Sequence, residues 1–393
     1  MRFENTTLGQ LSLGGKGNYG IAASAVPYSE NLLTYLRITD ISDQGTLRKQ
    51  SLMSVADENA DKYLLKPNDI VFARTGNSTG RNYFYDGTDG NFVYAGFLIK
   101  FSLDPQKVNP RYIKYYCQSS QYWNWVQSFN TGSTRGNINA QTFANMEIPL
   151  PPREQQDFLV RLLRPLDDKI ELNQKINENL EQQAATLINQ YQSVTDSAEM
   201  LSNIMGFENG FAFQSSTYLS SGQYKVITIK NVQDGRIDSD GAACIDSLPS
   251  RMKNGCILQI GDALLSLTGN VGRVGIVCES NLLLNQRVAK IVPHNKALLP
   301  FLYFVYRQPS VKTQLESIAK GTAQLNLSPV ETLKLTVPYE KASALSLTQT
   351  LAPLYQTIIS NGQENIALAL LRDTLLPKLM SSEIDVSDIA LSC

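Results

Sequence analysis

The chain repeats one sequence pattern at a spacing of about 190 residues, far longer than the 20 to 50 residues of solenoid repeats. One copy, GSTRGNINAQTFANMEIPLPP, begins at Gly132, and the other, GTAQLNLSPVETLKLTVP, begins at Gly321. In both copies an asparagine follows the first glycine by five residues, and proline closes the stretch. Because duplicated segments fold alike, this repeat constrains the fold more strongly than any compositional feature.

Earlier stretches align in the same order at nearly the same spacing. YLRITDISDQGTL, from Tyr35, matches VITIKNVQDGRID, from Val226. LKPNDIVFARTGNSTGR, ending at Arg81, matches LQIGDALLSLTGNVGR, ending at Arg273. The sequence therefore predicts two duplicated units rather than one large domain.

Each unit has the pattern of a mixed α/β module. Short β-branched stretches such as 35–41, 70–73 and 97–101 are separated by Gly, Asn and Asp turns, which is typical of strands. A helix-like stretch follows in each unit, from Asn109 and from Leu299, and then a last strand and a long polar helix. We therefore expect an α+β fold with two duplicated mixed modules.

The two long helices share a heptad seam in which polar residues recur at matched positions. Such a narrow seam suits a paired helix, although each helix could instead cover its own sheet. Buried asparagines lower stability but fix register, so matched asparagines favour pairing of the two helices. We expect a kink or break at Pro165, and we expect the second helix to end at LLPKLMSSEIDVSDI, from Leu375, where Pro377 breaks the pattern. The seam positions are Leu166, Ile170, Asn173, Asn177, Leu180, Leu187, Leu354, Ile358, Asn361, Asn365, Leu368 and Leu375.

Charge follows the same organisation. The predicted modules, 1–150 and 200–339, carry 14 basic against 12 acidic residues and 13 against 9. The predicted helical connectors, 151–199 and 340–393, carry 5 against 9 and 3 against 6. Basic modules on acidic connectors are compatible with modules that face a polyanion.

The chain resembles the specificity (S) subunits of type I restriction-modification systems. The resemblance spans essentially the whole chain and rests on PLPPREQQ from Pro149, LDDKIELNQKINENLE from Leu166, NGFAFQSSTY from Asn209 and LRDTLLPKLMSSEIDVSD from Leu371. Ser382 stands where glycine usually precedes the EI pair, and the second PLPP-type phrase has become VPYEKASA.

The resemblance implies a non-catalytic scaffold that reads DNA. It implies two target-recognition modules separated by two long antiparallel paired helices, with a pseudo-twofold axis, each module reading half of a bipartite double-stranded DNA site. The implied partners are two adenine-N6 methyltransferase subunits, which use S-adenosylmethionine, and restriction/translocase subunits, which use ATP and Mg. The chain itself would bind no cofactor. The alternative is an assembly or inhibitory scaffold of a decayed system that does not bind DNA.

The sequence does not offer the motifs of an enzyme. GQLSLGGKG departs from a P-loop, GNVGRVG is not a dinucleotide fingerprint, and no Asn-Pro-Pro-aromatic motif is present to hold a flipped adenine. The one histidine, His294, leaves little acid-base chemistry near neutral pH. Five scattered cysteines predict neither a metal site nor a disulfide framework. Without an apolar spanning run, we expect a cytoplasmic protein.

Basic and amide side chains are the candidates for contact with DNA, because they bind phosphates, guanine and adenine. A turn shared by two modules that read different sequences should be structural or contact phosphate, whereas bases should be read where the units differ. The candidates in the shared turns are Arg74, Thr75, Asn77, Ser78, Arg81, Thr268, Asn270 and Arg273. The candidates elsewhere are Lys16, Asn18, Tyr19, Arg48, Lys49, Arg135, Gln214, Lys230, Asn231, Arg251 and Lys253.

Overall fold

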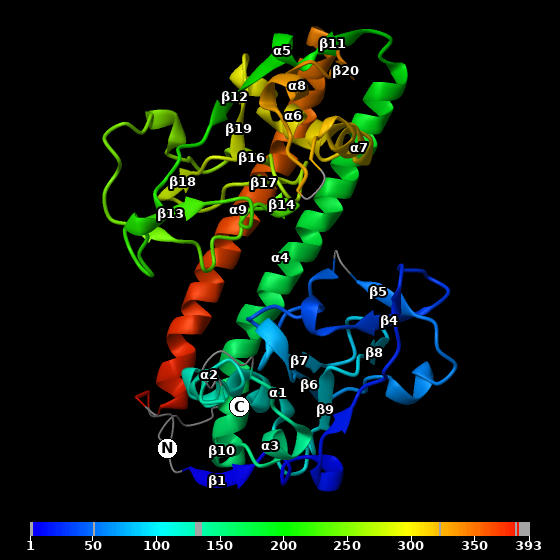
Figure 1. Ribbon diagram of the computed structural model, residues 1–393, viewed down its shortest axis with the longest axis vertical. Helices are drawn as coiled ribbons and strands as arrows, with labels where there is room; N and C mark the ends of the chain where they lie inside the picture. Colours follow the sequence, from blue (N-terminus) through cyan, green and yellow to red (C-terminus); the bar gives the residue numbers. More distant parts are fainter. Residues whose placement is uncertain (1–2, 50–51, 130–135, 322–323, 382, 385–393) are drawn as a thin grey trace. The chain divides into compact units, whose positions relative to one another are not determined.

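The computed structural model describes residues 3–49, 52–129, 136–321, 324–381 and 383–384 (Figure 1). The chain divides into two compact units. Unit 1 comprises Met1–Leu166 and Leu370–Cys393, and unit 2 comprises Asp167–Ala369. This division differs from the four-part division at 150, 199 and 339, because each long helix contributes to both units; the four-part division stays a prediction.

Unit 1 is built from strand pairs and small mixed sheets. Strands β1 and β10 pair antiparallel, β2-β9-β6-β7 form a second sheet, and β3-β5-β4-β8 form a third, in which β4 and β8 run parallel. The strands are β1 (Glu4–Thr7), β2 (Asn18–Tyr19), β3 (Ala25–Val26), β4 (Leu33–Leu36), β5 (Met53–Val55), β6 (Asp69–Ala73), β7 (Asn82–Tyr85), β8 (Phe92–Tyr94), β9 (Leu98–Ser102) and β10 (Glu147–Leu150).

Short helices cover the β2-β9-β6-β7 sheet of unit 1. These are α1 (Pro110–Tyr116), α2 (Ser120–Gln127) and α3 (Ala140–Ala144), and each begins after a polar side chain that caps its first backbone amides. The ring of Phe72, on β6, stacks on Phe143 of α3 at a centroid distance of 4.7 Å. The aromatic side chains therefore form the core between sheet and helices.

Unit 2 repeats most of this arrangement, although its two main sheets have five and three strands where those of unit 1 have four each. Strands β11 and β20 pair antiparallel, β12-β19-β16-β17-β14 form the larger sheet, and β15-β13-β18 form the smaller one, in which β13 and β18 run parallel. The strands are β11 (Ala198–Met200), β12 (Met205–Asn209), β13 (Tyr224–Ile227), β14 (Gly235–Arg236), β15 (Cys244–Ile245), β16 (Ala263–Ser266), β17 (Val274–Ile276), β18 (Leu282–Leu284), β19 (Val288–Pro293) and β20 (Thr336–Pro338). The short helices are α5 (Leu201–Ile204), α6 (Leu299–Tyr306), α7 (Pro309–Ile318) and α8 (Pro329–Leu333). The prediction of two duplicated mixed α/β modules is confirmed.

The two long helices are α4 (Arg153–Val194), green in Figure 1, and α9 (Lys341–Met380), orange to red. Both continue through their prolines, so a break at Pro165 was a wrong prediction. The end of α9 at Met380, three residues beyond Pro377, lies within the stretch LLPKLMSSEIDVSDI, where the sequence predicted it. A proline inside a helix removes one hydrogen bond, a cost of about 3 kcal/mol. Both prolines lie on the exposed side, whereas neighbouring Leu163 and Leu376 are buried and hold the helix in place.

The helices pair through their asparagines in unit 2. The side-chain amide of Asn173 donates to Oδ1 of Asn365 at 2.9 Å, and that of Asn361 donates to Oδ1 of Asn177 at 2.8 Å. Asn173 and Asn361 occupy the same position in the two copies of the repeat, as do Asn177 and Asn365. Asn173 therefore pairs with the counterpart of Asn177, and Asn177 pairs with the counterpart of Asn173. Such reciprocal contacts are the pattern of a twofold axis between like surfaces. The predicted antiparallel pairing is confirmed.

Charged side chains complete this polar network. Asn173 also donates to Oε2 of Glu364 at 2.7 Å, and Lys169 Nζ lies 3.2 Å from the same carboxylate oxygen. The hydrogen bonds from Asn173 and Lys169 lower the pKa of the Glu364 carboxyl below its ordinary value. Asn173 is fully buried, so these bonds satisfy an amide that would otherwise destabilise the fold.

The long helices also cover the cores of the modules. Ala184 and Ile188 of α4 pack in the core of unit 2, and Leu376 and Leu379 of α9 pack in the core of unit 1. The sequence left open whether each long helix pairs with the other or covers its own sheet. In the structure each of them does both. Every predicted seam position is buried or half-buried.

Candidate nucleic-acid interface

The two motifs that repeat in the sequence meet in space within each unit. Thr75 of the Thr-Gly-Asn turn forms an isolated antiparallel bridge with Asn137, and Thr268 forms the same bridge with Asn326. In unit 2 the hydroxyl of Thr268 donates to Oδ1 of Asn326 at 2.9 Å. The asparagine that follows the repeated glycine therefore fastens the repeated turn, and this shared contact explains why both motifs recur.

Glycines make the shape of this turn possible. Gly76 and Gly269 both have φ of 73°, and Gly80 and Gly272 have φ of 87° and 80°. Residues other than glycine rarely adopt these positive values. A Cβ atom on Gly80 would also lie 2.5 Å from the side chain of Val126. The turn is thus a frame built on matching positive-φ glycines in both units, although it is one residue longer in unit 1.

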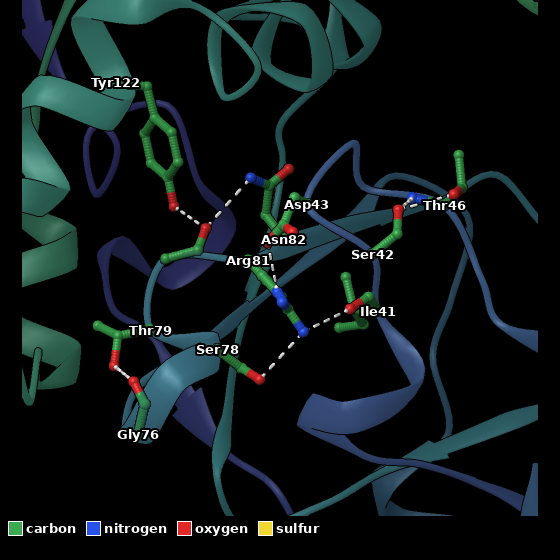
Figure 2. A network of polar contacts seen from close by, with 11 residues as sticks. Ile41, Ser42, Asp43, Thr46, Gly76, Ser78, Thr79, Arg81, Asn82 and Tyr122 are labelled. Carbon is green, nitrogen blue, oxygen red and sulfur yellow. Dashed lines mark hydrogen bonds and ion pairs between the residues drawn. The ribbon is translucent and has the colours of Figure 1, made fainter. Parts of the chain in front are cut away.

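The repeated arginine holds this frame from inside. Figure 2 shows Arg81 reaching back to Asp43, with its Nε 2.6 Å from Oδ1, and donating to Ser78 Oγ at 3.3 Å. Its counterpart Arg273 donates to Oε1 of Gln233 at 2.8 Å. Arg81, Ser78 and Arg273 were candidates for DNA contact, but the structure uses their polar atoms within the protein.

A second duplicated contact lies under the turn. Lys100 pairs with Asp69 at 3.0 Å in unit 1, and Lys290 pairs with Asp262 at 3.4 Å in unit 2. Each aspartate also accepts a backbone N–H from three residues earlier, at 2.8 Å and 2.9 Å. These lysines are committed to the frame and leave little charge for a ligand.

The other predicted residues differ in burial, and the exposed ones are not thereby without partners: the Tyr19 hydroxyl accepts from the N–H of Ala140 at 3.2 Å. Asn231 is buried, accepts from the backbone of Thr228 and donates to the carbonyl of Asp238 at 2.9 Å. Lys49 forms an ion pair with Asp89 at 3.1 Å, Thr75 is half-buried and Thr268 buried, and Arg135 lies outside the described residues. The exposed candidates are Lys16, Asn18, Tyr19, Arg48, Asn77, Gln214, Lys230, Arg251, Lys253 and Asn270.

Beside the turn of unit 1, the structure brings together two predicted residues and one that was missed. The Arg74 guanidinium lies over the Tyr19 ring, 5.1 Å from its centroid. The backbone N–H of Arg74 donates to the carbonyl of Phe97 at 3.1 Å, and the Phe97 side chain is 56% exposed. Nε of Arg74 is buried and has no hydrogen-bond partner among the described residues.

The same backbone contacts recur in unit 2 with other side chains. The N–H of Leu267 donates to the carbonyl of Arg287 at 2.9 Å, as Arg74 does to Phe97. Asn209 pairs with Ala289 in the ladder position that Tyr19 and Ile99 occupy in unit 1. Sequence reasoning missed Arg287 and Phe97; extending the repeat alignment across the β8–β9 and β18–β19 loops would have paired them.

Two further searches bear on the site. No group of three or more His, Cys, Asp and Glu side chains within the described part of the chain is placed to hold a metal ion. Along the same residues, no helix combines the length and apolar character needed to cross a membrane.

Comparison with known proteins gives the same assignment throughout. The family described as the type I restriction modification DNA specificity domain matches residues 19–182 and again residues 200–369. The type I restriction enzyme HindI specificity subunit of Haemophilus influenzae is 24% identical over 404 residues, covering 82% of this chain and 88% of the relative. The MjaIX specificity subunit of Methanocaldococcus jannaschii is 25% identical over 318 residues, covering 71% and 70%.

A solved structure shares the fold. The S subunit of the type I restriction-modification system of M. genitalium superposes with a TM-score of 0.51 at 19% identity, covering 96% of each chain. Because the family match occurs twice and spans most of the residues, this chain belongs to the type I restriction modification DNA specificity domain family.

Proposed function

We propose that this chain is the DNA-specificity subunit of a type I restriction-modification complex, and that each unit reads one half of a bipartite target. The observation that carries the proposal is the double match to a DNA specificity domain in a chain whose two units share one backbone frame. Two similar readers in one chain suit a target with two separate blocks. The relatives are named as specificity subunits of type I restriction enzymes.

The exposed polar residues around the turns support contact with nucleic acid. Asn77 and Asn270 lie exposed at the tips of the duplicated turns, where they can approach phosphates in the same way in both units. Lys16 and Lys253 add exposed charge in unit 1 and unit 2. Residues shared by the units would set position on the duplex, and residues that differ would read bases.

The chemistry of modification belongs to the partners in this proposal. Two adenine-N6 methyltransferase subunits would bind the chain and supply the S-adenosylmethionine site, and restriction subunits would supply ATP- and Mg-dependent cleavage. The paired helices α4 and α9 offer them a surface, because Leu172 and Leu370 remain exposed outside the buried seam. The chain alone would neither methylate nor cut DNA.

Mapping N6-methyladenine in cells with and without this gene tests the proposal. We expect loss of methylation at one motif with two specific blocks and an unread gap. Replacing residues 1–150 with the matching module of a relative should change one block only. An unaltered methylome after deletion, or a continuous motif, would contradict the proposal and favour a scaffold that does not read DNA.

A further inference from the structure

Three positions in each unit share their backbone contacts but differ in side-chain chemistry. The first lies in the strand beside β9 or β19, the second at the start of the turn, and the third in the loop before β9 or β19. Equivalence is fixed by hydrogen bonds rather than by alignment, because position two donates to position three in both units. We call them the reading positions: Tyr19, Arg74 and Phe97 in unit 1, and Asn209, Leu267 and Arg287 in unit 2.

A second pair of contacts confirms this equivalence. The carbonyl of Arg74 accepts from the N–H of Ile138 at 3.0 Å, and that of Leu267 accepts from Leu327 at 2.7 Å. Ile138 and Leu327 each follow the asparagine that fastens the turn. The duplicated frame therefore holds the reading positions by the same backbone hydrogen bonds in both units. The units differ in their side chains and at the third position also in backbone conformation, because Arg287 has a positive φ and Phe97 does not.

Arg74 differs from other arginines of unit 1. Arg37, Arg81 and Arg111 pair with aspartates at 2.7 Å, 2.6 Å and 2.8 Å. Arg74 has the Tyr19 ring beneath it, and its buried Nε–H has no partner among the described residues. An unsatisfied buried donor lowers stability and is uncommon in native proteins, so it requires an explanation such as an ordered water or a bound ligand. An oriented guanidinium can match the O6 and N7 acceptors of guanine with its planar fork of donors.

Unit 2 places its cation elsewhere in the same frame. Leu267 is buried and cannot donate from its side chain, whereas Arg287 is exposed at the third position with φ of 73°. Asn209, exposed at the first position, carries the amide that pairs with adenine. The arginine is thus at the second position in unit 1 and at the third position in unit 2. The two units therefore present different hydrogen-bond donors to DNA.

We infer that Arg74 is a specificity-determining residue that reads a guanine in the block recognised by unit 1. Tyr19 orients its guanidinium, and Phe97 covers the contact from water. In unit 2, Arg287 takes the corresponding role from the third position. This inference rests on the proposed function and deepens it, because it assigns bases to particular side chains.

Selection of randomised duplex DNA by the complex purified from its own cells tests the inference. We expect the wild-type complex to enrich two blocks, and Arg74→Leu, which installs the unit 2 residue, to weaken the preference for one guanine in one block about 5- to 150-fold. Arg74→Lys keeps the charge but not the fork, so it should retain affinity while relaxing that position. Arg287→Phe should alter the other block only.

The matched control is Lys62→Gln, an exposed lysine of unit 1 that bonds only to nearby Asn59 in the structure. This variant should leave both blocks unchanged, and circular dichroism melting should show that each variant is folded. Wild-type enrichment without any motif would overturn the proposed function itself. A wild-type bipartite motif that persists unchanged in folded Arg74→Leu and Arg74→Lys would overturn the inference and leave the proposed function standing.

Discussion

Single arginines near the turn have opposite roles, and their bonding distinguishes them. Arg81 of unit 1 has a counterpart in unit 2, Arg273, and both side chains are bonded inside the protein. Arg74 has no arginine counterpart, and its buried Nε–H has no hydrogen-bond partner among the described residues. Recurrence between two readers of different sequences therefore marks a structural residue. On our inference, the residues that carry base specificity are those at which the backbone contacts are shared between the units and the side chain is not.

Replacing Arg81 by leucine should lower the stability of the fold without altering the DNA target. The bond to Asp43 is charge-assisted, but Asp43 is exposed to solvent, so we expect a loss of about 1 kcal/mol. Urea unfolding measures the loss, and motif selection by the same variant checks specificity. An altered block with an unchanged unfolding midpoint would mean that Arg81 reads DNA after all.

Glu340 should make the beginning of α9 sensitive to acid. Its carboxylate accepts from the Ser343 hydroxyl at 2.7 Å and from the backbone N–H groups of Ala342 and Ser343 at 2.9 Å and 2.7 Å, which lowers its pKa to about 2. A lowered carboxyl pKa gives stability that is complete above the ordinary value of 4.5 and is lost as pH falls toward 2. Glu340→Gln should melt earlier at neutral pH, with the difference from wild type vanishing at low pH. A difference that is constant with pH would assign the loss to packing.

At the scale of elements, the heptad spacing predicted the pairing of α4 and α9 because a seam of period 3.5 must face a partner. The break predicted at Pro165 was wrong because it considered only the local effect of proline on the helix. The rule that proline ends a helix is local, whereas Pro165 and Pro377 are exposed in helices fixed by buried leucines such as Leu163 and Leu376. Tertiary packing thus outweighs local propensity where the ring can face solvent.

Replacing Asn173, Asn177, Asn361 and Asn365 together by leucine should raise the melting temperature by a few °C. Apolar seams are more stable than polar ones, but the asparagines fix which residues face each other. We therefore expect weaker selection of register, seen as lower yield of a uniquely assembled complex. Scanning calorimetry and native mass spectrometry measure the two effects. Unchanged melting together with unchanged assembly would contradict a role for these residues in the seam.

At the scale of the molecule, the duplication made the order of elements predictable, because most strands and helices of one copy have a counterpart in the other, with β14 and α5 among the exceptions. The candidate interface was less predictable. Asn231 and Arg81 have suitable chemistry, but spacing cannot show that their polar atoms are already bonded inside the protein. Phe97 and Arg287 were missed because neither residue looks like its counterpart, and only the shared backbone contacts relate them.

The last prediction concerns the connection between the units. Inserting seven residues after Leu166 in α4 and seven after Ala369 in α9, at the boundaries of the units, should keep the phase of the seam. The insertion lengthens each helix by about 10 Å at 1.5 Å per residue, close to three base pairs at about 3.4 Å each.

If each unit reads its block independently, the unread gap should grow by about three base pairs while both blocks stay intact. Methylome sequencing of cells carrying this variant measures the gap directly. The same insertion in α4 alone is the control, because it shifts one side of the seam against the other and should abolish methylation rather than lengthen the gap. An unchanged gap in the double insertion would mean that the paired helices do not set the distance between the blocks.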